Sequence, residues 1–251
     1  LYSLISHLEV TGGVWSAMGG TGRIVEAMGN LMKSQGTTIR LNAEVDQITA
    51  ESGRVTGVRL KNGEQLDAEL VISNADAAWT YRQLLSETKR RKWTDKRVDK
   101  AHFSNGLFVW YFGTNKQYHD IPHHSIVLGP RYKGLLTDIF RHKRMTDDFS
   151  LYLHRPTATD PSMAPDGCDT FYALVPVPHL DSGTDWTTYA ETFRQAVEAR
   201  LEATMIPELG KHLATSLMLT PLDFQNRLNS VKGAGFSFEP RITQSLSLIH
   251  I

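Results

Sequence analysis

Two groups of residues have types and spacing that suggest chemistry: the glycines of 19-GGTG-22 and the adjacent histidines His123 and His124. Glycines directly before a helical pattern can cradle a phosphate, because the backbone approaches the ligand closely at the helix N-terminus. A dinucleotide fingerprint needs a third glycine, where this sequence has Val25, and no Gly-Lys-Ser/Thr of a Walker loop follows. We therefore predict a tight turn that starts a helix, with an anion site as the alternative.

The other reactive side chains give weaker signals. His123 and His124 are neighbours on an expected strand, so they should point to opposite faces and not share a metal; no metal site is predicted. The stretch 235-GFSFE-239 lacks the last glycine of a nucleophile elbow, and Cys168, the only cysteine, lies in a turn-like stretch. The residues alone thus show no catalytic group.

Composition limits the class of protein. The 251 residues are 41% hydrophobic, which suffices for one large domain or two modest ones. The 27 basic and 27 acidic side chains cancel, so no nucleic-acid partner is implied. No apolar run approaches the ~20 residues of a membrane span, and the single cysteine suits a reducing cytoplasm.

The first third of the chain has an α/β-like pattern. Apolar residues from Ile24 to Met32 recur at helical spacing, and Gly36 is the expected stop. A strand is predicted over 39–48, followed by a hairpin over 53–73 that turns at Asn62-Gly63. The strand ending in 70-LVISNAD-76 precedes an expected domain boundary near residues 76–80.

The remaining two thirds mix helices and strands in an α+β manner. Helical patterns cover 77–85 and 89–102, and a strand buried on both faces is predicted over 107–112. Further strands are predicted at 124–129, 149–154 and 170–177. A long amphipathic helix should begin near Asp185 and end before Pro207.

Longer strings carry a resemblance to a known family. The chain resembles the bacterial phytoene desaturases, FAD-dependent carotenoid dehydrogenases of the flavin amine-oxidase superfamily. The strings that carry it are 129-GPRYKGLLTDIF-140, 148-DFSLYLHRPTATDPSMAPDGCDTFYALVPVPHL-180, 1-LYSLISHLEVTGGVW-15, 19-GGTG-22, 70-LVISNAD-76, 107-LFVWYFG-113 and 220-TPLDFQNRLN-229. The sequence departs from the family at Ser16 and Ala17, where an aromatic residue and a proline are typical, and at 245-SLSLIHI-251. Because the N-terminal G-x-G-x-x-G unit is also absent, we expect an internal fragment.

The resemblance implies a fold and a cofactor. Residues 1–78 would form part of a FAD-binding Rossmann-like domain of the glutathione-reductase/amine-oxidase type, as its middle segment. Residues 79–244 would form a mixed-sheet substrate-binding domain with a helical cap, and 245–251 a tail foreign to the family. The Val45 backbone would meet the adenine edge, and Gly19, Gly20, Ser73 and Asn74 would lie near FAD.

The resemblance also implies an activity: dehydrogenation of a linear C40 carotenoid precursor by hydride transfer to flavin, inside a long apolar tunnel. Aromatic strand residues are the expected lining, with core packing as the alternative for each: Phe108, Trp110, Tyr111, Phe112, Phe171 and Tyr172. Entry of a lipid-dissolved substrate implies peripheral contact with the membrane on its cytoplasmic side. The stretch 89-KRRKWTDKR-97, with Trp93, is the suggested contact, and a solvated charged helix the alternative.

Two other interpretations stay open. The first is another flavin oxidoreductase, acting on later carotenoids, on a retinol-type substrate or on an amine. The second is a non-catalytic remnant unable to hold FAD, and the fragment by itself is expected to be inactive. The proton acceptor, the electron acceptor, the number of desaturation steps and the oligomeric state do not follow from the sequence.

Overall fold

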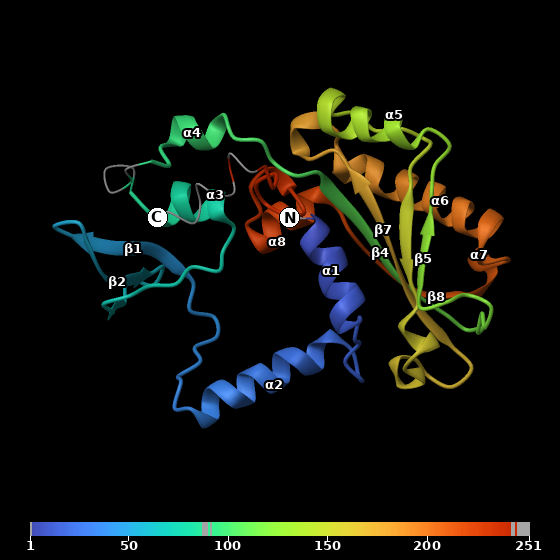
Figure 1. Ribbon diagram of the computed structural model, residues 1–251, viewed down its shortest axis with the longest axis horizontal. Helices are drawn as coiled ribbons and strands as arrows, with labels where there is room; N and C mark the ends of the chain where they lie inside the picture. Colours follow the sequence, from blue (N-terminus) through green and yellow to red (C-terminus); the bar gives the residue numbers. More distant parts are fainter. Residues whose placement is uncertain (1, 87–89, 91, 242–243, 245–251) are drawn as a thin grey trace.

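The computed structural model describes residues 2–86, 90, 92–241 and 244 (Figure 1). A five-stranded sheet with helices α5, α6 and α7 forms one side of the molecule, and a small three-stranded sheet lies on the other side. Helix α2 crosses the space between them. Among the described residues, no helix combines the length and apolarity needed to cross a membrane. The proposed tail 245–251 lies outside the described residues.

The N-terminal segment contains two helices joined by the glycine turn. Helix α1 spans Tyr2–Gly12 and α2 spans Thr21–Ser34. Gly19 and Gly20 have φ angles of 80° and 84°, which L-residues rarely adopt, so the predicted glycine turn before a helix is confirmed. Helix α2 buries none of its residues, and its apolar stripe is exposed.

The small sheet is an antiparallel meander of β1 (Val45–Glu51), β2 (Arg54–Leu60) and β3 (Gln65–Asp67). The predicted turn at Asn62-Gly63 is confirmed, with the Glu64 amide donating to Asn62 Oδ1 at 3.0 Å. The prediction of a strand from residue 39 is wrong, because Asn42 has a left-handed φ of 55° and pairing starts at Val45.

The second strand of the predicted hairpin also ends earlier than expected. Pairing stops at Asp67, and residues 70–73 run without a partner strand. Leu70 and Ile72 are 76% and 86% exposed. Their apolar character thus reflects a surface that nothing in the described part of the chain covers.

A small aromatic cluster follows the first sheet. Helix α3 (Ala77–Trp79) continues into a π-helical turn over Thr80–Leu84, and α4 spans Asp95–Asp99. Trp93 is 3% exposed and stacks between Tyr81 and Phe238, with ring centroids 5.5 and 5.0 Å away. Its proposed place on a membrane-contacting face is therefore wrong, because the indole is the centre of a core cluster. The helix predicted over 89–102 is limited to α4 within the described residues.

The large sheet has the strand order β5-β6-β7-β4-β8 and is antiparallel throughout. Four strands match the predictions: β4 (Gly106–Thr114), β5 (His124–Val127), β6 (Leu151–His154) and β7 (Asp169–Val177). The edge strand β8 (Leu213–Leu219) was not predicted, and its mostly half-buried or exposed residues explain the weak signal. Shorter helices are α5 (Tyr132–Thr137), which continues as a π-helical turn over Asp138–His142, α7 (Leu209–His212) and α8 (Pro221–Leu228).

Helix α6 (Trp186–Thr204) covers one face of this sheet (Figure 1). The helix begins near Asp185 as predicted, and the Asp185 side chain caps it by accepting a hydrogen bond from the Thr187 amide at 3.0 Å. Its apolar stripe packs on β4, where the Phe108 ring lies 6.0 Å from Trp186 and 5.0 Å from Phe193. The even-numbered residues of β4 thereby belong to the main core.

A buried ion pair fastens β7 to the loop after β6. Asp169, at the start of β7, accepts hydrogen bonds from Arg155 Nε at 2.9 Å and Nη2 at 3.2 Å. It also accepts from Thr157 Oγ1 and from the Tyr118 amide, both at 2.7 Å. Four donors therefore satisfy one carboxylate inside the protein.

Candidate functional site

A cavity of about 600 Å³ lies on the face of the large sheet away from α6. Strand alternation brings the odd-numbered residues of β4 and the even-numbered residues of β7 to this face. The N-terminal segment forms the opposite wall. The lining includes Leu107, Val109, Tyr111, Thr170, Tyr172 and Leu174 from the sheet, and Trp15, Met18 and Ile24 from the N-terminal segment.

The glycine turn holds the N-terminal wall in place. The Gly19 amide donates to Asp160 Oδ2 at 2.5 Å, and the same carboxylate accepts from the Ser162 amide and hydroxyl. The hydrogen bond from the Gly19 amide has the largest effect and lowers the pKa of Asp160. The hydrogen bonds from Ser162 lower it further. Gly20 lies against Met163, so closely that a Cβ atom would be 2.9 Å from Met163 Cε. The anion at the glycine turn is thus a carboxylate of the same chain, which corrects the alternative of an anion site at Gly19.

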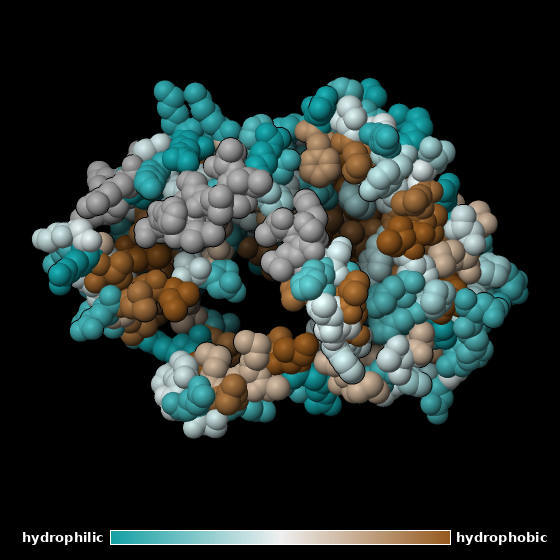
Figure 2. Space-filling view, viewed as in Figure 1, coloured by the Kyte–Doolittle hydropathy of each residue, from teal (hydrophilic) through white to brown (hydrophobic). Residues whose placement is uncertain are grey.

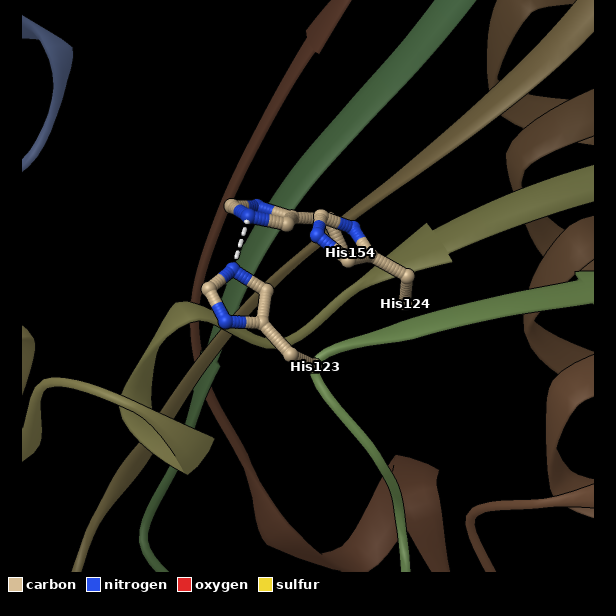
Figure 3. A group of neighbouring side chains, drawn as sticks. All are labelled: His123, His124 and His154. Carbon is tan, nitrogen blue, oxygen red and sulfur yellow. Dashed lines mark hydrogen bonds between the residues drawn. The ribbon is translucent and has the colours of Figure 1, made fainter. Parts of the chain in front are cut away.

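Three histidines gather at one end of the cavity (Figure 3). His154 ends β6, His124 begins β5, and His123 precedes β5. The expectation that His123 and His124 point to opposite faces is wrong, because strand alternation does not extend to a residue outside the strand. Their rings stack 4.3 Å apart, and His123 Nε2 lies 2.7 Å from His154 Nε2.

Three titratable groups on the sheet side of the cavity, His154, His123 and Tyr172, are shifted toward their neutral forms. Burial, followed by the nearby His123 and His124, lowers the pKa of His154 to about 4. Burial, followed by His124, also lowers the pKa of His123. Burial and the hydrogen bond with Tyr152 raise the pKa of Tyr172 to about 12. These side chains therefore carry no charge at neutral pH, so the sheet side of the cavity suits an apolar ligand.

The structure divides the aromatic residues that the sequence suggested as tunnel lining. Tyr172 and Tyr111 border the cavity, with ring centroids 5.6 Å apart. The rings of Phe108, Trp110 and Phe112 lie on the α6 side, at 0%, 0% and 2% exposure, and pack in the core. The prediction does not hold for these three, because the strand turns its even-numbered residues away from the cavity. Phe171 contributes to the cavity floor, while its ring stacks on Phe112 in the core.

The residues suggested to bind a cofactor do not form one cluster. Gly19 and Gly20 lie at the start of α2, whereas Val45 comes after the end of that helix. A 14-residue helix is about 21 Å long, so α2 separates the glycines from the segment that leads to Val45. Ser73 Oγ is 2.8 Å from Thr80 Oγ1, and Asn74 is exposed. Between these groups, a hollow of about 420 Å³ follows the apolar stripe of α2. Figure 2 shows apolar residues bordering the opening between α2 and the small sheet.

The start of β1 has a feature that suits a backbone contact. The pairing of β1 with β2 shifts register between Val45 and Gln47. Such a bulge leaves one residue of the ladder without its regular partner. The β1 backbone near Val45 is therefore not fully used by the small sheet.

The histidine cluster is the part of this site that sequence reasoning missed. His124 and His154 are directly paired residues of β5 and β6. Both strands were predicted, but their register was not, and register decides which side chains meet. A histidine at the end of each of two predicted strands was the only available signal.

Comparisons with known proteins define the class. Residues 1–111 match the family described as flavin containing amine oxidoreductase. The fold is shared with the crystal structure of an oxidoreductase from Methanosarcina mazei, at a TM-score of 0.57, 20% identity and coverage of 81% of this chain and 43% of that one. A protein from Pyrococcus furiosus gives a TM-score of 0.55 at 17% identity, covering 80% of this chain and 43% of that one.

Curated relatives narrow the assignment. The chain is 50% identical over 250 residues to a neurosporene-forming phytoene desaturase of Cereibacter sphaeroides, an alignment that covers 98% of this chain and 48% of the relative. It is 41% identical over 246 residues to a lycopene-forming phytoene desaturase of Pantoea ananas, covering 98% of this chain and 50% of the relative. The chain thus spans about half the length of the curated relatives it matches. The similarity to phytoene desaturases over 98% of this chain confirms the resemblance, and the match to the flavin containing amine oxidoreductase family agrees with the mixed helix and sheet fold class.

Proposed function

We propose that this chain is part of a FAD-dependent phytoene desaturase, which dehydrogenates a linear C40 carotenoid precursor. The observation that carries the proposal is the 50% identity to a phytoene desaturase over 98% of this chain. Residues 1–78 are proposed to belong to the FAD-binding domain and 79–244 to the substrate-binding domain. The two curated relatives described above are both phytoene desaturases, and neither is named for a retinol-type or amine substrate.

The cavity supports a hydrocarbon substrate. Leu107, Val109 and Leu174 supply apolar surface from the sheet, and Trp15 and Ile24 supply it from the other wall. A polyene precursor has no polar handle, so its position depends on the shape of such walls and on the exclusion of water. When bound, FAD would supply the hydride acceptor. This chain's contribution is to hold the substrate in register with that acceptor.

The proposed FAD contacts follow from the local geometry. Val45 precedes the bulge of β1, where the register skips Asp46, and its backbone is proposed to meet the adenine edge, while Ser73 and Asn74 are exposed polar residues after β3. Gly20 borders the cavity, whereas the Gly19 amide is engaged by Asp160 and would act only by holding the turn.

Peripheral membrane contact remains part of the proposal, but with a different surface from the one the sequence suggested. Val25 lies on the amphipathic helix α2, is 70% exposed and does not line the hollow along that helix. Such a helix can lie in the interface of a bilayer, from which a lipid-dissolved substrate would enter. A location at the cytoplasmic side of the membrane is proposed on the same basis.

A chimaera tests the function. Residues 1–244 of this chain replace the matching segment of the Cereibacter sphaeroides relative, so that the other half of the enzyme is present. We expect the chimaera to hold FAD and to convert phytoene in liposomes into polyenes that absorb at longer wavelength. A chimaera that folds and holds FAD but forms no such polyene would refute the proposed activity. A folded chimaera that holds no FAD would favour the remnant interpretation.

The adenine contact has its own test in the same chimaera. Val45→Pro removes the backbone donor, whereas Val45→Ile keeps it and serves as the matched control. We expect FAD affinity to fall at least tenfold in Val45→Pro and to stay unchanged in Val45→Ile. Equal affinities in a folded pair would reject this contact without bearing on the substrate.

A further inference from the structure

The three histidines at the end of the cavity form a cluster that the proposed activity does not use. One ring nitrogen from each of His123, His124 and His154 lies within 4.8 Å of the other two (Figure 3). Two adjacent strands position them, since His124 pairs directly with His154 across β5 and β6. The cluster therefore rests on a rigid part of the sheet.

Hydrogen bonds to residues outside the cluster hold the Nδ1 atom of two of these rings and do not use Nε2. His123 Nδ1 is paired with Thr159 Oγ1, and His124 Nδ1 lies 2.6 Å from Tyr152 Oη. Each Nε2 atom is thereby available as a ligand. Metal-binding histidines generally have this arrangement, in which the second nitrogen is held by a hydrogen bond that fixes the tautomer and the ring orientation.

His154 is poorly satisfied without a ligand. Its Nε2 faces His123 Nε2 at 2.7 Å, so the two rings share a single donor there, and its Nδ1 is buried without a hydrogen-bond partner among the described residues. Burying an unsatisfied polar group costs free energy. Coordination of both Nε2 atoms to one cation would replace the single hydrogen that the two rings share there.

We propose that His123, His124 and His154 bind one divalent transition metal ion of the zinc, nickel or copper class through their imidazole nitrogens. In a tetrahedral site with Zn–N bonds of 2.0–2.1 Å, ligand nitrogens lie about 3.4 Å apart. The observed 2.7 Å between His123 and His154 and the 4.8 Å limit of the cluster bracket this value. Small rotations of the side chains therefore suffice to form the site.

The surroundings favour such an ion over a hard cation. All three ligands are imidazoles, which suit zinc, copper and nickel better than magnesium or calcium. Three protein ligands leave a fourth position, and the cluster lines the cavity, so that position is open to water or a small ligand. This site does not depend on the proposed desaturase activity.

Metal titration of the 251-residue chain, purified without a histidine tag and freed of metal by a chelator, tests the site. Calorimetry with Zn²⁺ should show one ion per chain, and Co²⁺ should give the visible absorption of a tetrahedral nitrogen site. His124→Ala and His154→Gln should weaken binding at least tenfold. The control His119→Ala changes an exposed histidine outside the cluster and should bind as the wild type does.

Folding of the variants is checked by far-UV circular dichroism, and His124 is exposed, so its replacement should leave the fold intact. Zn²⁺ should raise the melting temperature of the wild type and of His119→Ala, but not that of His124→Ala. The proposal is overturned if the wild type binds no stoichiometric ion. It is equally overturned if folded His124→Ala binds Zn²⁺ as tightly as His119→Ala does.

Discussion

Asp169→Asn should destabilise the protein severely, because it removes the charge that neutralises a buried guanidinium. Arg155 is 4% exposed, and the Asp169 side chain is fully buried. Asparagine keeps the shape but leaves Arg155 with only the Ile121 carbonyl, at 2.8 Å, as an undisturbed acceptor. Removing one partner of a buried pair typically costs about 3–5 kcal/mol, since the remaining charge stays buried and uncompensated.

Urea unfolding followed by tryptophan fluorescence measures this cost. We expect a lower midpoint with an unchanged slope, which assigns the change to stability. The double variant Asp169→Leu/Arg155→Met should recover more than half of the loss, because no unpaired charge remains. Glu44→Gln breaks the exposed pair with Lys61, whose side chains are 58% and 61% exposed, and should not shift the midpoint measurably. A loss below about 1 kcal/mol in Asp169→Asn would refute the reasoning.

Two further predictions concern a buried histidine and a strand glycine. Burial, and next the nearby Lys143, lowers the pKa of His179 to about 4, so between pH 6.5 and 4 the unfolded chain binds a proton that the folded chain does not. The free energy of unfolding should therefore fall by about 3 kcal/mol on acidification through this window. His179→Gln should remove that part of the pH dependence, and equal pH dependence in the two proteins would contradict the assignment. A Cβ at Gly57, where φ is 151°, would lie 2.0 Å from the Leu66 carbonyl oxygen, so Gly57→Ala should push β3 away. Amide hydrogen exchange at residues 65–67 should then accelerate at least tenfold. The control Gly29→Ala places a methyl group in open space on α2 and should stabilise that helix slightly. Unchanged exchange in Gly57→Ala would show that the strand pair tolerates the methyl group.

Local patterns in the sequence predicted the elements that local physics controls. The stripe from Trp186 to Leu201, capped by Asp185, specifies α6, and Asn62-Gly63 specifies a hairpin turn. Residues 70–73 show the limit of such reasoning. Their apolar character reads as a strand, but a strand exists only where another backbone pairs with it.

The site depended on information that a single strand does not contain. Strand β4 is apolar on both faces, so its sequence does not show whether the odd-numbered or the even-numbered residues face α6. Tyr172 and Phe108 therefore looked equivalent, although one borders the cavity and the other is core. The histidine cluster required the register between β5 and β6, which turns and partner strands determine together.

The alternation of β4 separates the residues that stabilise the fold from the residues that shape the cavity. These two requirements usually compete when a protein diversifies. Even-numbered positions such as Trp110 hold the sheet against α6, and changing them endangers the whole fold. Odd-numbered positions such as Val109 and Tyr111 border the cavity and leave that packing alone. A combinatorial library confined to the odd register, with the neighbouring Tyr172 and Leu174, would explore ligand shape at nearly constant thermal stability. Natural variation can follow the same route. Because substitutions in the odd register leave the core packing unchanged, a new ligand specificity can arise without a prior gain in stability.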